Sequence, residues 1–250
     1  MDSTKSGLIV LTAAVSPHSD VPFTALSPLE RLELYKAGFS FWLAEAISME
    51  LKLVVVETTG QPAHSFFTDE ELAFVHFINF SPNPRFNKFG KGALEAECLD
   101  HAVSVMSDLY APETTFHKVT GKLIVPNVKS ILRPQADREI TIRRSLDRSV
   151  CDTRIFSTTL GTWQAFFSGM SEFTNDLFPD KYIEHVIANN SVLGEFGGGL
   201  TVSQFSKIPK IKGISGSNGV AYGGFTKDGL SNVISHVEKL FITRFKKRLI

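Results

Sequence analysis

Two short basic segments of the chain could bind a phosphate group. Gly90-Lys91-Gly92 precedes a predicted helix, so it places a cation and flexible backbone at a helix N-terminus, where N–H groups and the helix dipole attract anions. The segment Lys118 to Lys122 (KVTGK) carries two cations, a hydroxyl and a glycine at a predicted strand end. Together they favour a diphosphate site, although each alone also fits a polar loop or a solvated edge strand.

Common nucleotide-binding motifs do not account for these segments. The chain has no G-x-x-x-x-G-K-[ST], which argues against a P-loop nucleotidase. Glu95 stands where the third glycine of a dinucleotide fingerprint would follow Gly90 and Gly92, which argues against a Rossmann dehydrogenase. The segment Thr12 to Ser16 contains no glycine, which argues against a methyltransferase.

The elements that would position these residues alternate in the first half of the chain. Apolar runs predict strands over 7–15, 53–56 and 73–80, and 3.6-residue periodicity predicts helices over 27–47 and 92–109. Ser27, Pro28 and Glu30 form an N-terminal capping signature for the first helix. This alternation predicts a parallel sheet, with a ligand site at the carboxyl ends of its strands.

The pattern changes in the second half. We expect strands over 116–125 and 139–144, further short strands within 153–167, a helix over 182–188, and glycine-rich turns over 194–199 and 213–224. An amphipathic helix over 230–249 ends in a cluster of cations. We expect it to dock on the core, and its basic face could also contact an anionic membrane.

Composition limits the classes of partner. Lys plus Arg equals Asp plus Glu at 26 each, so no net field favours nucleic acid. No apolar run approaches the roughly 20 residues that span a bilayer, and the N-terminus lacks the charged start and cleavage site of a signal peptide. We therefore expect a cytoplasmic protein, or one at a membrane surface. Cys98 and Cys151 show no metal-ligand spacing, and we assign them no function.

Several segments taken in order resemble a group of small glycosyltransferases of capsule, lipopolysaccharide and virus-encoded glycan pathways. The segments are ERLELYKAGFSFWL, VVVETTG, FGKGALEA and HKVTGKLIVPN, followed by Asp152-Thr153-Arg154, Tyr182 to His185 and Pro209 to Gly219. The resemblance implies an α/β, GT-A-like (Rossmann-like) mixed sheet flanked by helices. We expect one domain over 1–250, with a nucleotide-sugar-binding half over 1–125 and an acceptor-side half over 126–250.

The same resemblance implies roles on the donor side. Thr12 and Glu57 would line the nucleoside pocket, three lysines would neutralise the diphosphate, and Glu95 would orient one lysine or a sugar hydroxyl. Glu57 could equally cap a turn. The donor-side residues are Thr12, Glu57, Gly90, Lys91, Gly92, Glu95, Lys118, Thr120, Gly121 and Lys122. Lys122 stands where an arginine is usual in this group, which leaves a point charge instead of a bidentate contact.

Metal independence is a further expectation. GT-A enzymes usually hold a divalent metal through an Asp-x-Asp pair, and this chain contains none. Glu95 and Glu97 are two residues apart on a predicted helix, so their side chains point in different directions and cannot share a metal. We expect no cofactor, with the lysines stabilising the leaving diphosphate instead.

An inverting transfer also needs a carboxylate that accepts the proton of the acceptor hydroxyl. The resemblance points to Glu184 at the start of a helix, with Asp152 and Asp180 as alternatives. Arg154 and His185 would bind the acceptor, although His185 could simply pack. The expected partners are a nucleotide-sugar donor and a glycan or glycolipid acceptor, and the expected activity is hexosyl transfer. The alternative is a non-catalytic nucleotide- or glycan-binding module.

Overall fold

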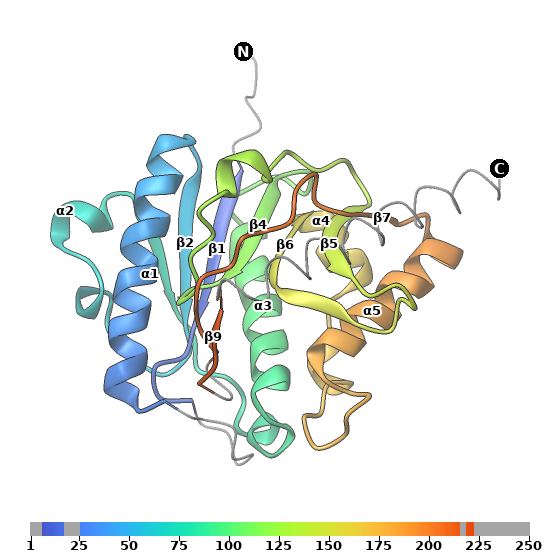
Figure 1. Ribbon diagram of the computed structural model, residues 1–250, viewed down its shortest axis with the longest axis horizontal. Helices are drawn as coiled ribbons and strands as arrows, with labels where there is room; N and C mark the ends of the chain where they lie inside the picture. The colour runs from blue at the N-terminus through green and yellow to red at the C-terminus, as the bar shows by residue number, and fades with distance from the viewer. Residues whose placement is uncertain (1–6, 18–25, 216–218, 223–250) are drawn as a thin grey trace.

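The protein is described by a computed structural model that covers residues 7–17, 26–215 and 219–222 (Figure 1). Seven strands form one sheet in the order β3-β2-β1-β4-β6-β5-β7. They are β1 (Leu8–Ala13), β2 (Lys52–Glu57), β3 (Val75–Asn79), β4 (Thr115–Thr120), β5 (Glu139–Arg144), β6 (Cys151–Thr159) and β7 (Thr201–Ser203). A separate pair consists of β8 (Gly213–Ile214) and β9 (Ala221–Tyr222).

Five α-helices occur in the described residues: α1 (Pro28–Ser48), α2 (Asp69–Leu72), α3 (Lys91–Ser107), α4 (Leu160–Phe166) and α5 (Ile183–Leu193). Shorter helical turns cover Ala63–Ser65, Pro84–Phe89, Val128–Ser130, Met170–Glu172 and Gly194–Gly198. None of the described helices is long and apolar enough to cross a membrane.

The direction of the strands changes halfway across the sheet. β1 pairs in parallel with β2 and β4, and β2 pairs in parallel with β3. β6 runs antiparallel to both β4 and β5, whereas β7 is parallel to β5. The fold is therefore a mixed α/β sheet flanked by helices, as the sequence predicts.

Both faces of the central strands are buried, which explains their continuous apolar sequences. On one face, α1 packs Tyr35, Phe39 and Trp42 against β1 and β2. On the other face, α3, α4 and α5 pack against the alternate residues of the same strands, and Trp163 of α4 stacks on Phe156 of β6. Figure 1 shows these two layers on opposite sides of the sheet.

Helix α1 begins as its capping signature predicts. The Glu30 N–H donates to the Ser27 hydroxyl at 3.3 Å, and the Glu30 carboxylate accepts the Ser27 N–H at 2.8 Å. Farther along the helix, the Trp42 indole N–H donates to the Leu123 carbonyl at 2.7 Å. These contacts fix α1 against the segment that follows β4.

A close approach between α1 and the end of β4 depends on two glycines. A Cβ atom at Gly38 would lie 2.1 Å from the Gly121 carbonyl oxygen, and a Cβ at Gly121 would lie 2.6 Å from the Phe39 ring. Gly121 was expected to belong to the donor site. Its position shows that it lets the helix approach the loop that carries Lys122.

Replacing Gly38 by alanine should therefore destabilise the protein. Overpacking a tight contact costs about 1–3 kcal/mol, and the higher helix propensity of alanine offsets up to ~1 kcal/mol of that. The free energy of unfolding, measured in urea, should fall for Gly38→Ala. It should stay within about 0.5 kcal/mol for Ser40→Ala, an exposed position on the same helix. Equal stability of the two variants would contradict the close approach.

Three expectations about elements need correction or stay open. The segment 153–167 is not a series of short strands, because β6 ends at Thr159 and α4 follows directly. Leu29 and Ile47 fit the helical periodicity of α1 but are 70% and 51% exposed. The predicted helix over 230–249 lies outside the described residues, and so does its membrane contact.

Candidate active site

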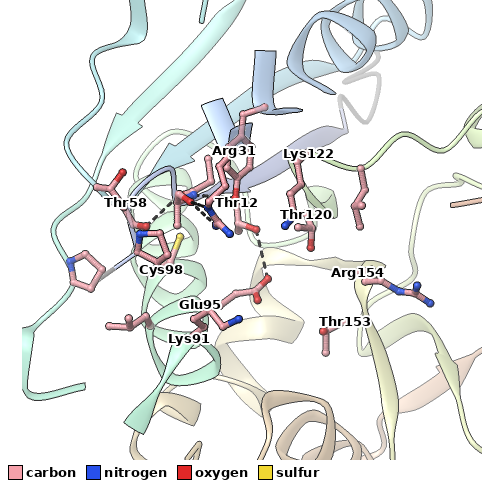
Figure 2. A pocket seen from close by; sticks show the side chains of 18 of the residues that line it. Thr12, Arg31, Thr58, Lys91, Glu95, Cys98, Thr120, Lys122, Thr153 and Arg154 are labelled. Atoms are coloured by element: carbon pink, nitrogen blue, oxygen red, sulfur yellow. Dashed lines mark hydrogen bonds between the residues drawn. The ribbon is translucent and has the colours of Figure 1, made fainter. Parts of the chain in front are cut away.

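A pocket of about 340 Å³ opens at the carboxyl ends of β1 and β4, where an α/β sheet is expected to bind its ligand. Residues far apart in the chain meet there (Figure 2). The lining includes Thr12, Ala13, Ala14, Arg31, Thr58, Thr59, Pro82, Pro84, Asn87, Lys91, Glu95, Cys98, Thr120, Lys122, Thr153, Arg154, Glu184 and Tyr222. The structure thus brings together about half of the predicted site residues, from both halves of the chain.

Four cations line this pocket, Arg31, Lys91, Lys122 and Arg154, and of these Arg31 was not predicted. Lys91 comes from the start of α3 and Lys122 from the loop after β4, while Arg31 lies in the first turn of α1. A cation there opposes the helix dipole. This unfavourable placement is the sequence signal that could have identified Arg31. The Arg31 Nε donates to the carbonyl oxygens of Ala14 and Val15 at 2.9 and 3.1 Å, which fixes the guanidinium at the end of β1.

The cations lower one another's affinity for protons. Burial, followed by the charges of Arg31 and Lys91, lowers the pKa of Lys122 to about 7. Burial also lowers the pKa of Lys91, as does Arg31, whereas Asp176, Glu95 and Glu184 oppose that change. Among the described residues, neither Arg31 nor Lys122 forms an ion pair. The pocket therefore presents positive charge to an incoming anion.

Lys118 does not share this role. Its side chain is fully buried and forms an ion pair with the Glu95 carboxylate. The ammonium also donates to the Thr153 carbonyl at 2.7 Å and the Thr120 hydroxyl at 3.2 Å. The structure therefore does not support the prediction that Lys118 neutralises a diphosphate directly. Its ammonium is engaged by groups of the protein instead. Glu95 does orient one lysine, as predicted, and it also accepts the Thr12 hydroxyl at 3.4 Å.

Glu57 also lies behind the pocket instead of lining it. Its carboxylate is fully buried and accepts the Thr59 N–H at 2.8 Å, the Thr59 hydroxyl at 2.6 Å and the Gln61 N–H at 2.9 Å. Of the two roles considered for Glu57, the structure shows turn capping. Its effect on a ligand is indirect, because it shapes the loop that places Thr58 and Thr59 in the wall.

The N-terminus of α3 is already occupied by a carboxylate. The Gly92 N–H donates to Asp176 at 3.0 Å, and Gly90, with a φ of 96°, caps the helix. A Cβ atom at Gly90 would lie 2.5 Å from the Asp176 carboxylate, so the glycine is required there. The loop therefore offers an anionic ligand the Lys91 side chain, while Asp176 takes the helix N-terminus that was expected to bind phosphate.

Glu184 lines the pocket beside β6, in the first turn of α5. Its carboxylate accepts the Thr153 hydroxyl at 3.3 Å. Burial raises the pKa of Glu184, and the negative charges of Glu95 and Asp176 raise it further. A half-buried carboxylate whose pKa is shifted toward neutrality suits proton transfer.

Of the other predicted acceptor-side residues, some line the pocket and some do not. Arg154 lines the pocket, lies 4.7 Å from the centre of the Tyr222 ring, and is held by Asp152 through two hydrogen bonds of 2.8 and 2.7 Å. Asp152 is thus engaged by a guanidinium and lies outside the pocket lining. Asp180 is exposed, and His185 packs its ring against Tyr182. Glu184 is the candidate base that faces the pocket.

The described residues of the site provide neither a set of metal ligands nor a reactive thiol. Over the described residues, no three His, Cys, Asp or Glu side chains come together in a way that could hold a metal ion. Glu97 points away from Glu95 and accepts the Asn83 N–H at 2.8 Å. Cys98 lies in the pocket wall, but burial raises the pKa of its thiol, so it stays protonated.

Comparison with known proteins gives similarity at the level of structure alone. No protein-family model and no curated sequence matches the chain. Galactosyltransferase LgtC, solved with donor and acceptor sugar analogs, is 10% identical, with 79% of this chain and 72% of that chain covered and a TM-score of 0.48. A Drosophila β1,4-galactosyltransferase 7, solved with manganese, UDP-Gal and xylobiose, is 10% identical over 87% and 70%, with a TM-score of 0.46.

A third similar structure is a putative nucleotide-diphospho-sugar transferase from Desulfovibrio desulfuricans G20. It is 11% identical over 79% of this chain and 78% of that chain, with a TM-score of 0.42. Similarities at this level of identity and TM-score assign no role to any residue of this chain.

Proposed function

We propose that the protein is a glycosyltransferase that moves a sugar from a nucleotide-sugar donor to a hydroxyl of a glycan acceptor. One observation carries the proposal: a single pocket at the carboxyl ends of the central strands contains the cations Arg31, Lys91 and Lys122 together with a half-buried carboxylate, Glu184, beside β6. A nucleotide-sugar needs the cations for its diphosphate, and the acceptor hydroxyl needs the carboxylate for its proton.

The donor would lie across the ends of β1 and β2. The end of β1 and the segment after β3 offer small and apolar surface from Ala13, Ala14, Pro82 and Pro84 for a nucleoside, with the Asn87 amide nearby. The diphosphate would then reach the three cations in the middle of the pocket. The sugar would point toward Glu184, because that residue closes the side farthest from β2.

The transfer step follows from this placement. The acceptor oxygen forms a bond to the anomeric carbon as the bond from that carbon to the diphosphate oxygen breaks. The acceptor proton passes to Glu184, and the negative charge on the departing diphosphate is stabilised by Arg31, Lys91 and Lys122. We propose an inverting reaction of the hexosyltransferase type that needs no divalent metal. Arg154 and Tyr222 would contact the acceptor.

Other features of the proposal concern the context of the reaction. The donor half would extend over 1–125 and the acceptor half over 126–250, within a single domain. We propose a cytoplasmic enzyme, at the membrane surface where its acceptor is a glycolipid. The alternative, a nucleotide- or glycan-binding module without catalysis, would use the same cations but would have no use for a carboxylate with a raised pKa in the same pocket.

Ligand-dependent thermal unfolding tests the proposal. A ligand that binds only the folded protein stabilises it by about 2.7 kcal/mol at a concentration of 100 times Kd. We expect one set of nucleotide-sugars, screened with manganese and with EDTA, to raise the unfolding midpoint equally in both conditions. Release of the nucleotide in the presence of glycan acceptors would then show transfer.

Two results would count against the proposal. If no nucleotide or nucleotide-sugar raises the midpoint, the pocket does not bind the proposed donor. If the rise requires manganese, the donor is a nucleotide-sugar but the three cations do not replace a metal.

A further inference from the structure

A chain of polar contacts crosses the floor of the pocket and connects its two sides. It begins at Thr12 on β1, passes through Glu95 of α3 and Lys118 of β4 to Thr153 of β6, and ends at Glu184 of α5. Each member therefore comes from a different element. The Thr12 end belongs to the proposed donor side, and the Glu184 end belongs to the proposed acceptor side.

Lys118 is the centre of this chain. A lysine ammonium has three N–H donors, and the structure gives each of them a partner: the Glu95 carboxylate, the Thr153 carbonyl and the Thr120 hydroxyl. The side chain lies on the face of β4 that also carries the buried Phe116, so it points toward α3. Position and direction of the ammonium are both fixed.

Stability alone gives no reason to keep a cation in such a place. Replacing a buried ion pair by well-packed apolar side chains is often neutral or stabilising. Apolar residues surround Lys118 on the same face of the sheet, so a leucine or methionine would suit the packing. What an apolar side chain could not do is hold the Glu95 carboxylate and the Thr153 carbonyl at defined distances.

We propose that Lys118 is a positioning residue, whose buried ammonium ties Glu95 to the Thr153 segment and thereby sets the orientation and the electrostatic surroundings of Glu184. This inference rests on the proposed function. It departs from the sequence-based assignment, in which Lys118 contacts the diphosphate of the donor.

The surroundings of Glu184 show why the charge of Lys118 matters. The ionisable and polar groups that face it are Lys91 and Glu95 from α3, Asp176 from the loop before α5, and Thr153 with the neutral Cys151 from β6. Glu95 already raises the pKa of Glu184. Without the Lys118 ammonium beside it, the negative charge of Glu95 would act on Glu184 uncompensated and raise that pKa further.

Four variants test this role: Lys118→Met, Glu95→Gln, the double variant with both changes, and Thr153→Val. Lys52→Met, an exposed lysine at the opposite end of the sheet, is the control. The measurements are kcat, the KM for the donor, the pH dependence of kcat, and the unfolding midpoint. Kinetic constants are calculated per folded molecule, so that a loss of protein does not count as a loss of rate.

For Lys118→Met we expect kcat to fall about 10–100-fold with at most a threefold change in KM, because misplacing a reacting group costs about that much. The acid limb of the kcat profile should move to higher pH. Thr153→Val, which removes only the hydrogen bond to Glu184, should move it the same way.

The double variant separates positioning from stability. It leaves no unpaired buried charge, so its unfolding midpoint and the acid limb of its pH profile should return toward those of the unmodified protein. Its kcat should stay low, because the Thr153 carbonyl still lacks its donor. If Lys118→Met fails to fold because Glu95 is left unpaired, the double variant carries the test alone.

Three results would overturn the inference. One is recovery of full kcat in the double variant along with its midpoint, which would show a purely structural role. Another is an unshifted pH profile in Thr153→Val and Lys118→Met. The third is a larger loss in donor binding than in kcat, which would mean that Lys118 meets the diphosphate. An unmodified protein that binds no nucleotide-sugar would instead contradict the proposed function.

Discussion

Replacing Glu184 by glutamine should abolish sugar transfer while leaving nucleotide binding intact. Glutamine keeps the size of the side chain and the oxygen that accepts the Thr153 hydroxyl, but its amide cannot take a proton. Loss of a general base typically costs about 10²–10⁴ in rate. The nucleotide should bind with unchanged affinity because its diphosphate meets Arg31, Lys91 and Lys122, whereas Glu184 meets the acceptor.

The pH profile of the unmodified protein should agree with this assignment. A general base must be deprotonated to act, so kcat should rise as pH increases through the pKa of Glu184. Because burial and the neighbouring carboxylates raise that pKa, the rise should occur at a higher pH than an exposed glutamate would give. In Glu184→Gln this limb of the profile should disappear.

Transfer rates and calorimetric nucleotide affinities provide the measurement, with Glu33→Gln on the exposed face of α1 as the matched control. Unchanged transfer by Glu184→Gln would remove the base assignment. Loss of both transfer and nucleotide binding would mean that Glu184 supports the pocket structurally. Nucleotide binding by the unmodified protein without any transfer, over a range of acceptors, would favour the non-catalytic module.

Replacing Lys122 by methionine should weaken binding of a nucleoside diphosphate by roughly 10–100-fold, since a hydrogen bond to a charged group contributes about 1.5–3 kcal/mol. Lys122 is buried in the pocket, and burial together with Arg31 and Lys91 lowers its pKa to about 7, so the free protein loses this charge as the pH rises through the neutral range. An anionic ligand binds the protonated form better. Affinity should therefore be highest below pH 7 and should decline as pH rises above it.

Lys122→Arg tests the protonation directly. A guanidinium stays protonated throughout this range, so this variant should bind the nucleotide with little dependence on pH. Calorimetric titration with UDP or another nucleoside diphosphate, from about pH 6 to about pH 8.5, would show the difference. Lys52→Met serves as the control. An affinity of Lys122→Met equal to that of the unmodified protein would place the diphosphate elsewhere in the pocket.

Local sequence signals predicted much of the fold correctly. The strand expected over 139–144 is β5 with the same bounds, and α1 begins at its capping signature. The segment 153–167 was mispredicted because its Thr, Phe and Trp residues favour strands. The Thr159 hydroxyl nevertheless accepts the Thr162 N–H at 3.1 Å and starts α4, and the helical spacing of Leu160, Trp163 and Phe167 then buries one face.

The sequence was a poorer guide to which of the predicted site residues line the pocket than it was to the strands and helices. Lys118 and Lys122 lie four residues apart in the same basic segment, yet the first is buried against α3 and the second lines the pocket. The difference arises because Lys118 lies within β4, a central strand between β1 and β6, whereas Lys122 follows the end of that strand. The Lys118 side chain therefore meets Glu95, a carboxylate 23 residues earlier in the chain. No local pattern contains that pairing. Arg31 was missed although its cation stands in the first turn of a predicted helix, where a positive charge is unfavourable.

The strand order has a consequence for how the protein folds. β6 separates β4 from β5, although β5 precedes it in the chain. β5 can join the sheet only through β6, with which it forms an antiparallel hairpin. Until this hairpin docks, the β4 edge is open to pairing with other chains, and the Lys118 ammonium lacks the carbonyl of Thr153. Docking of the hairpin is thus the folding step that covers the β4 edge, buries the Lys118 ammonium and completes the pocket. A chain that stops folding before this step would be prone to aggregation.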